Sequence, residues 1–243
     1  MIKQIFTISL MLFPGYGCTH IFDSDSSRET IVVLTFDDAH RSIYETAFPL
    51  MQKFGFPATN YINTGIINTD GRLTVEELHI LEDEGGWETG GHTVHHVNLP
   101  QINIKEAEAE IAGGWKFLKD HNLQHSTFAL PSGHANSEVI KIIKKYFHSI
   151  RGSEDFKMKY PVDRYSLGYY DARNDDGSEK IIGRILSGIT HHECVVIIGF
   201  HYIIADKEIH SRAITPQEFE EILTFLHERK LKVMTVSEML EEL

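Results

Sequence analysis

The sequence predicts an α/β fold in which about seven or eight parallel strands close into a barrel covered by helices. Short apolar runs alternate with helical patterns along the chain, and this alternation implies parallel strands joined by right-handed crossovers. The polar residues best suited to chemistry follow directly after apolar runs, which is where barrel enzymes place their sites. No internal repeat or second domain boundary interrupts the pattern, so residues 30–243 are expected to form one domain.

The strands are predicted from short runs rich in β-branched and aromatic residues. These runs are residues 31–36, 58–62, 87–89, 127–130, 147–151, 194–200 and 232–235. Gly55 and Pro57 mark the turn before the second run, and Pro131, Ser132 and Gly133 form a turn after the fourth. The stretch 152–176 shows no clear periodicity and is expected to be irregular.

The helices are predicted from amphipathic runs between these strands. They are residues 42–54, 74–84, 105–121, 137–145, 178–190 and 215–230, with a short closing helix that begins at Ser237. Two starts have the spacing of a capping box, in which a threonine and a glutamate three residues later satisfy each other's backbone N–H groups. These pairs are Thr74 with Glu77 and Thr215 with Glu218.

Length and composition place the chain among ordinary globular domains. Its 243 residues, 42% of them hydrophobic, suffice for one α/β domain with a sizeable core. The net charge of -12 and the absence of a basic stripe argue against a nucleic-acid partner and make a strongly anionic polymer a poor substrate. Of two cysteines, Cys194 lies in an apolar strand pattern and is expected to be buried and inert, without a disulfide. We expect a monomer.

Residues 1–18 are expected to be a signal peptide. Lys3 provides a positive start, and residues 5–13 form an apolar run too short to span a bilayer. Cys18 follows Gly17 as in bacterial lipoprotein cleavage sites, where the cysteine becomes lipidated; secretion without a lipid is the alternative. The polar residues 19–29 are expected to be a tether. The protein is therefore expected to be exported, to the periplasm, the outer membrane or the cell surface of a bacterium.

Two adjacent carboxylates, Asp37 and Asp38, follow the first predicted strand. Because successive side chains at the end of a strand point in opposite directions, one carboxylate can bind a metal ion while the other faces a substrate. A bound dication lowers the pKa of a water molecule, and the neighbouring carboxylate can accept its proton. The alternative is that the two aspartates cap the next helix.

Three histidines, His92, His95 and His96, follow Gly90 and Gly91 about 54 residues later. His92 and His96, or alternatively His92 and His95, are spaced to share one ion with an aspartate if the segment turns. Three protein ligands leave coordination positions open for water and substrate, as in catalytic metal sites. The alternative is a surface loop with incidental histidines.

His201 stands at the end of the buried run 195–200 and could donate a proton to a leaving group. The alternative is a buried histidine whose hydrogen bonds are satisfied.

These residues resemble the motifs of the polysaccharide deacetylase family, the carbohydrate esterases related to chitooligosaccharide and peptidoglycan N-acetylglucosamine deacetylases. The resemblance covers about residues 30–243, with four motifs in the family's order. The matching segments are residues 35–38 (Thr-Phe-Asp-Asp), 91–99 (Gly-His-Thr-Val-His-His-Val-Asn-Leu), 128–133 (Phe-Ala-Leu-Pro-Ser-Gly) and 197–201 (Ile-Ile-Gly-Phe-His). The resemblance implies a distorted (β/α) barrel with about seven strands.

The resemblance also implies roles for single residues. Asp37 matches the family's catalytic base and His201 its catalytic acid. Three further residues match the ligands of a divalent metal ion, usually Zn²⁺ though other divalent ions are accepted by related members: Asp38, His92 and His96. The backbone N–H of Ser132 matches a donor to the oxyanion of the tetrahedral intermediate.

Two departures from the family pattern concern the substrate side. Ala129 stands where many members have an arginine that orients the base, and Arg151 or Arg164 is expected to supply that charge from a neighbouring strand. The family's Asp-Trp motif is not recognisable, and residues 163–167 occupy roughly that stretch.

The resemblance implies a metal-dependent hydrolase that removes acetyl groups from N-acetylated sugars of a polysaccharide or oligosaccharide. One alternative is an O-acetyl esterase acting on a polysaccharide such as acetylxylan. The other is a carbohydrate-binding protein with a decayed site, although the intact residues Asp37, Asp38, His92, His96 and His201 argue against decay.

Overall fold

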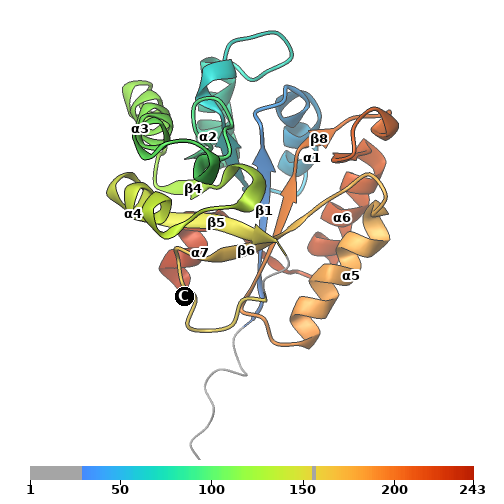
Figure 1. Cartoon of the computed structure of the whole chain (residues 1–243). Coiled ribbons are helices and arrows are strands. Elements are labelled where there is room, and N and C mark those ends of the chain that lie inside the picture. Colours follow the sequence, from blue (N-terminus) through green and yellow to red (C-terminus); the bar gives the residue numbers. More distant parts are fainter. Residues whose placement is uncertain (1–28, 155–156) are drawn as a thin grey trace, which may run out of the picture.

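The computed structural model describes residues 29–154 and 157–243, and its centre is a closed parallel sheet (Figure 1). Seven strands are hydrogen-bonded in sequence order, and the last pairs with the first. They are β1 (Ile31–Asp37), β2 (Thr59–Ile62), β3 (Glu88–Gly91), β4 (Thr127–Ala129), β5 (Ser149–Glu154), β6 (Leu167–Asp171) and β7 (Val195–Phe200). The prediction of a barrel with about seven parallel strands is confirmed.

The barrel is distorted at β1. The strand β10 (Lys232–Met234) pairs with the first three residues of β1, whereas β2 pairs with residues 35–37 on the same edge. Two strands therefore share one edge of β1, one below the other. A separate two-stranded sheet, β8 (Tyr202–Ile203) with β9 (Ala213–Ile214), follows β7.

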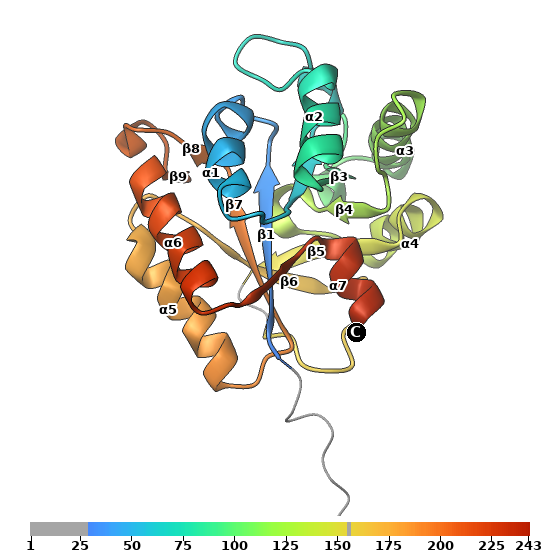
Figure 2. The ribbon, with the colours of Figure 1, turned by 180° about the vertical axis from the view of Figure 1, so that it is seen from behind.

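Helices cover the outside of the barrel on both sides (Figures 1 and 2). They are α1 (Phe48–Gln52), which continues the π-helical turn η1 (Ile43–Ala47), α2 (Val75–Gly85), α3 (Ile104–Asp120), α4 (Ser137–Tyr146), α5 (Gly177–Thr190), α6 (Pro216–Glu228) and α7 (Val236–Glu242). The capping boxes expected at Thr74 and Thr215 are both present. In the described part of the chain, none of these helices combines the length and hydrophobicity needed to cross a bilayer.

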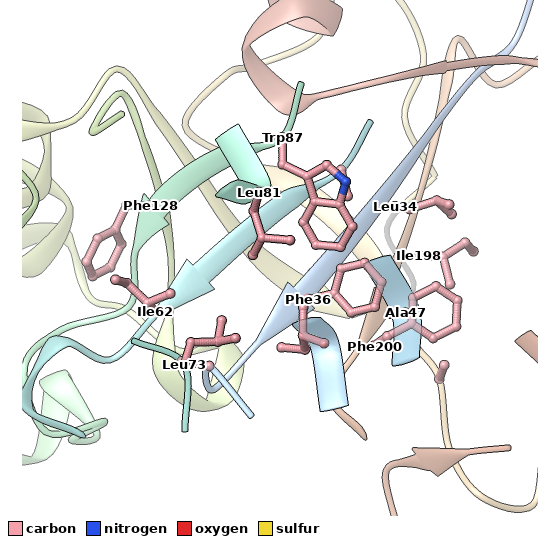
Figure 3. Packing of buried hydrophobic residues seen from close by; sticks show 14 of the residues in the cluster. Leu34, Phe36, Ala47, Ile62, Leu73, Leu81, Trp87, Phe128, Ile198 and Phe200 are labelled. Carbon is pink, nitrogen blue, oxygen red and sulfur yellow. The ribbon is translucent and has the colours of Figure 1, made fainter. Parts of the chain in front are cut away.

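The residues of β1 alternate between two hydrophobic clusters, one on each face of the sheet. Val32, Leu34 and Phe36 face the helices, and the ring of Phe36 stacks on Trp87 with centroids 5.0 Å apart (Figure 3). Ile31 and Val33 belong to the second cluster and face the barrel interior. Asp37 continues this inner series, so the alternation of the strand carries its carboxylate to the inner face at the strand's carboxyl end.

The same alternation explains how four further polar residues reach this end of the barrel. In each strand the inner positions have a spacing of two and lead toward the carboxyl end of the strand. These inner residues are His92 after β3, Arg151 in β5, Asp171 at the end of β6 and His201 after β7. All four are buried.

The expected signal peptide (1–18), the lipidation site Cys18 and nearly all of the tether (19–29) lie outside the described residues and stay predictions. Cys194 is buried, and its thiol donates to the carbonyl oxygen of Met158 at 3.3 Å.

Candidate metal centre and active site

The carboxylate of Asp38 and the imidazoles of His92 and His96 converge above the carboxyl ends of β1 and β3. Oδ1 of Asp38 lies 3.7 Å from Nε2 of His92 and 3.5 Å from Nε2 of His96. One ligand atom of each residue lies within 4.8 Å of the ligand atoms of the other two. Ligands of a tetrahedral zinc ion at its usual bond lengths lie about 3.4 Å apart, so the three atoms are spaced to bind one ion.

Two further observations fit a cation at this position. Oδ1 of Asp38 is buried and has no hydrogen-bond partner among residues 29–154 and 157–243, and such an oxygen needs a compensating positive charge. His92 places Nδ1 2.8 Å from the carbonyl oxygen of Ala129. Because a carbonyl only accepts, Nδ1 carries the proton and Nε2 presents its lone pair to the centre.

The local backbone of both segments is unusual. Asp38 has φ of 69°, and Thr93 and His96 have φ of 67° and 55°. These left-handed turns redirect the chain immediately after β1 and β3, so that Asp38 and both histidines point at one another. The turn also distinguishes the pairing of His92 with His96 from that of His92 with His95. His95 points to Glu110 of α3, with Nδ1 2.7 Å from Oε1. His96, and not His95, faces Asp38.

Asp37 lies beside this centre and is bound by Arg151. Nη2 of Arg151 donates to Oδ1 and Oδ2 of Asp37 at 2.8 and 2.6 Å, and both side chains are buried. Burial by itself would raise the pKa of Asp37, but the charge of Arg151, with smaller effects of His92 and His201, lowers this pKa to about 2. Asp37 is therefore an ionised carboxylate with a fixed orientation.

His201 faces both aspartates. Its Nε2 is 3.8 Å from Oδ2 of Asp37 and 4.0 Å from Oδ2 of Asp38, and Nη1 of Arg212 lies 3.4 Å from the same nitrogen. Burial lowers the pKa of His201 to about 4; Asp37 and Asp38 oppose this shift, and Arg212 reinforces it. Because Nε2 faces the two carboxylates, the imidazole can exchange a proton with a group bound beside them.

Asp171 is a residue of the site that the sequence did not reveal. Its carboxylate lies 3.5 Å from Nδ1 of His201 and also pairs with Nε of Arg212 at 3.1 Å and Nη2 of Arg173 at 3.0 Å. A carboxylate at Nδ1 orients the imidazole and directs Nε2 toward the aspartates. The only signal in the sequence is the alternation Leu-x-Tyr-x-Asp of residues 167–171, which ends in an acid as β1 does.

The remaining predicted residues have different positions. Arg164 lies at the opposite end of the barrel, where it lines a hollow with His148, Ser149 and residues of α7. Ser132 lies in the turn η4 (Pro131–Gly133) directly after β4, exposed and with φ of 59°. This turn is at the same end of the barrel as the candidate metal centre.

A family model described as polysaccharide deacetylase matches residues 24–149, more than half of the chain. The poly-β-1,6-N-acetyl-D-glucosamine N-deacetylase of Staphylococcus aureus is 31% identical over 170 residues, which cover 63% of this chain and 58% of that protein. The chain therefore spans less than two thirds of the length of this relative.

Two solved structures share the fold. The Xyl-CE4 domain of a multidomain xylanase from the hindgut metagenome of Trinervitermes trinervoides superposes with a TM-score of 0.65 at 16% identity, covering 88% of this chain and 91% of that one. The Streptococcus pyogenes deacetylase PplD, in complex with acetate, gives a TM-score of 0.57 at 22% identity, covering 62% and 68%.

Proposed function

The chain belongs to the polysaccharide deacetylase family, and from this premise we propose that it is a metal-dependent hydrolase that removes acetyl groups from N-acetylated sugars of a polysaccharide or oligosaccharide. The observation that carries the proposal is the convergence of Asp38, His92 and His96 on one point, with Asp37 and His201 beside it. This arrangement supports a base, an acid and a cation that act together on one bond of the substrate.

Each residue has a defined task in this proposal. Asp38, His92 and His96 would hold a divalent cation, proposed to be Zn²⁺, which would polarise an acyl carbonyl and lower the pKa of a water molecule. Asp37 accepts the proton of the attacking water, and the backbone N–H of Ser132 donates to the oxygen that becomes negative. His201, when protonated at Nε2, gives this proton to the nitrogen as the C–N bond breaks, and the proton taken up by Asp37 restores the imidazolium. The products are acetate and a free amine on the sugar.

Arg151 and Asp171 position the two proton-transferring groups. The double hydrogen bond from Arg151 fixes the plane of the Asp37 carboxylate and keeps it ionised. Asp171 fixes the ring of His201 from the Nδ1 side. Arg151 thereby supplies the charge that the family pattern places at position 129, where this chain has alanine.

The test is an acetate-release assay on a panel of glycans, with a chelator and after zinc is added back. Poly-β-1,6-N-acetylglucosamine is the first substrate to try, because the S. aureus relative is named for it. We expect the chelator to abolish release and zinc to restore it. We also expect Asp37→Asn to abolish turnover with the metal still bound, and His92→Ala to lose the metal. Wild-type activity in both variants would refute the assignment.

An O-acetyl esterase is the second candidate, and the lowered pKa of His201, about 4, favours it. An imidazole with this pKa is neutral at pH 7, and an alkoxide leaves with less help from an acid than an amide nitrogen does. Release of acetate from acetylxylan but not from N-acetylglucosamine oligomers would select the esterase. Glycan binding with no acetate release under any metal condition would select the decayed carbohydrate-binding protein.

We also propose that the catalytic domain of residues 30–243 is an exported monomer, which the signal peptide of residues 1–18 directs and which a lipid on Cys18 anchors through the tether of residues 19–29. Support comes from the sequence pattern of Lys3, the apolar residues 5–13 and Gly17-Cys18. Fractionation of cells producing the full chain or Cys18→Ala tests both steps. A lipoprotein moves from the membrane to the soluble exported fraction in the variant, whereas retention of the wild-type chain in the cytoplasm would refute export.

A further inference from the structure

His95 is the histidine of the three that does not face the candidate metal centre, and its partner is Glu110 on α3. Nδ1 of His95 lies 2.7 Å from Oε1 of Glu110, and the His95 side chain is 67% exposed. The second carboxylate oxygen, Oε2, accepts from the backbone N–H groups of Val94 at 3.0 Å and His95 at 2.8 Å. One carboxylate therefore holds three groups of the segment between the two histidine ligands.

This segment requires external support because its backbone is unfavourable. Thr93 and His96 both have positive φ, which is uncommon for residues other than glycine and an outlier for a β-branched threonine. Such conformations persist only where the surroundings determine them. Inside the segment, the hydroxyl of Thr93 accepts a hydrogen bond from the backbone N–H of His96 at 2.9 Å.

The opposite edge of the segment is held by η2 (Thr64–Ile66). The N–H of Thr64 donates to the carbonyl oxygen of Thr93 at 3.1 Å, and the N–H of Gly65 donates to that of Val94 at 2.8 Å. The carbonyl groups are thus bound by η2, and the N–H groups are bound by Glu110. Because both edges are fixed, the turn cannot rotate without breaking bonds on one side.

We propose that Glu110 is a positioning residue of the metal centre, whose carboxylate holds residues 93–96 in the turn that aims Nε2 of His92 and His96 at Asp38. His95 contributes by closing the third bond to the same carboxylate. The inference rests on the proposed metal site. It assigns His95 to orientation of the ligands and not to coordination, because its Nδ1 is turned to Glu110.

The experiment is a zinc dissociation constant from competition with a chromogenic chelator, with no substrate present. Glu110→Leu removes both acceptor oxygens and keeps a side chain of similar bulk. Glu108→Leu is the matched control, because Glu108 lies on the same helix and pairs with Lys145 of α4. Loss of groups that orient metal ligands weakens metal binding about 10–100-fold. We therefore expect Glu110→Leu to bind zinc at least about tenfold more weakly than the wild type, and Glu108→Leu to bind it as tightly as the wild type.

Two further variants separate positioning from general stability. Glu110→Gln keeps an oxygen for the two backbone N–H groups and is expected to restore affinity to within about threefold of wild type. His95→Ala leaves the two backbone bonds in place and is expected to weaken binding less than Glu110→Leu does. The Co²⁺-loaded protein adds a spectroscopic readout, since displaced histidines change the visible absorption band of the ion.

Equal zinc affinity in Glu110→Leu and Glu108→Leu would overturn the inference. If Glu110→Leu does not fold, Glu110→Asp replaces it, because that variant keeps the charge and withdraws the oxygens by one methylene. Wild-type affinity in Glu110→Asp with a wild-type Co²⁺ spectrum would then overturn it. Failure of the wild-type protein to bind zinc would instead remove the proposed metal site itself, so the two failures are distinguishable.

Discussion

Arg151 and Asp37 lie 114 residues apart in the chain, yet Nη2 of Arg151 reaches both carboxylate oxygens of Asp37, at 2.8 and 2.6 Å. The guanidinium group is packed between two aromatic rings, 3.9 Å from the ring centre of Tyr169 and 4.9 Å from that of Tyr61. Arg151 is paired in register with Ala129 on the neighbouring strand. We propose that Arg151 supplies, from one strand further along, the charge that the family pattern places at position 129.

Replacing Arg151 by alanine should remove most of the catalytic activity and leave metal binding intact. Without the guanidinium, burial raises the pKa of Asp37, and the carboxylate loses its fixed orientation. We expect kcat for acetate release to fall about a hundredfold or more. The unpaired buried carboxylate should also destabilise the fold by about 3 kcal/mol, measured by urea unfolding.

Arg164→Ala is the control for this prediction, because Arg164 was the second candidate for the same role and lies at the opposite end of the barrel. It should retain wild-type kcat. A large loss in Arg164→Ala together with an active Arg151→Ala would contradict the role given to Arg151.

Asp171 should be needed for proton transfer by His201. Asp171→Asn keeps the size of the side chain but removes the charge that lies 3.5 Å from Nδ1 of His201. The ring is then free to adopt other orientations, and we expect kcat to fall about 10–100-fold, with zinc affinity unchanged. Steady-state kinetics and chelator competition measure the two quantities separately.

Asp163→Asn provides the matched control, since Asp163 belongs to the stretch in which the sequence placed the missing family motif. Its carboxylate accepts from the N–H of Tyr165 at 2.9 Å in an exposed turn. The control should be fully active. If the two asparagine variants were equally active, Asp171 would have no part in the reaction.

The sequence predicted six of the seven barrel strands, β10 and two capping boxes, and it proposed the metal ligands, because these depend on local patterns. Asp37 and Asp38 are adjacent and His92 and His96 are four residues apart, so each pair is visible as a short motif. Asp171 was missed because β6 is a five-residue strand with Gly168 inside it, in a stretch that shows little periodicity. The pairing of Arg151 with Asp37 and the contact of Glu110 with His95 depend on which strands and helices become neighbours, and no local pattern contains that information.

Replacing Gly199 by alanine should lower both the stability and the activity of the protein. A Cβ at this inner position of β7 would lie 2.7 Å from Cδ2 of Tyr169 and 3.4 Å from Nη1 of Arg151. Tyr169 would have to shift, and Arg151 is packed against it. We expect Gly199→Ala to destabilise the protein by about 1–3 kcal/mol and to lower kcat. Thermal unfolding and acetate release test the two effects.

Gly183→Ala is the matching substitution at a tolerant position. Gly183 lies in the interior of α5, and a Cβ there meets nothing within 4 Å. Alanine favours the helix, so this variant should gain about 0.5–1 kcal/mol and keep full activity. Equal stability of the two alanine variants would show that the space at Gly199 is not limiting.

Glu88 lies at the end of the barrel opposite to the candidate metal centre, and it should make the stability of the protein depend on pH. Its carboxyl group is buried, and burial raises its pKa, partly offset by hydrogen bonds from Ser237 and Thr59. The folded state therefore holds this proton more tightly than the unfolded chain, whose glutamate has its ordinary pKa of 4.5. The contribution of Glu88 to stability is complete below pH 4.5 and is lost as the pH rises through its folded pKa.

Glu88→Gln should abolish this dependence, since its amide does not titrate. The difference in free energy of unfolding, wild type minus Glu88→Gln, should therefore fall as the pH is raised from 4.5 to 7, by about 1.4 kcal/mol for each tenfold increase in proton affinity on folding. Urea unfolding in the presence of a chelator excludes metal binding from the measurement. Glu241→Gln, on the exposed face of α7, should follow the wild-type curve. If the curves of the wild type and Glu88→Gln run parallel over this range, Glu88 is ionised in the folded protein, and the bonds from Ser237 and Thr59 outweigh the effect of burial.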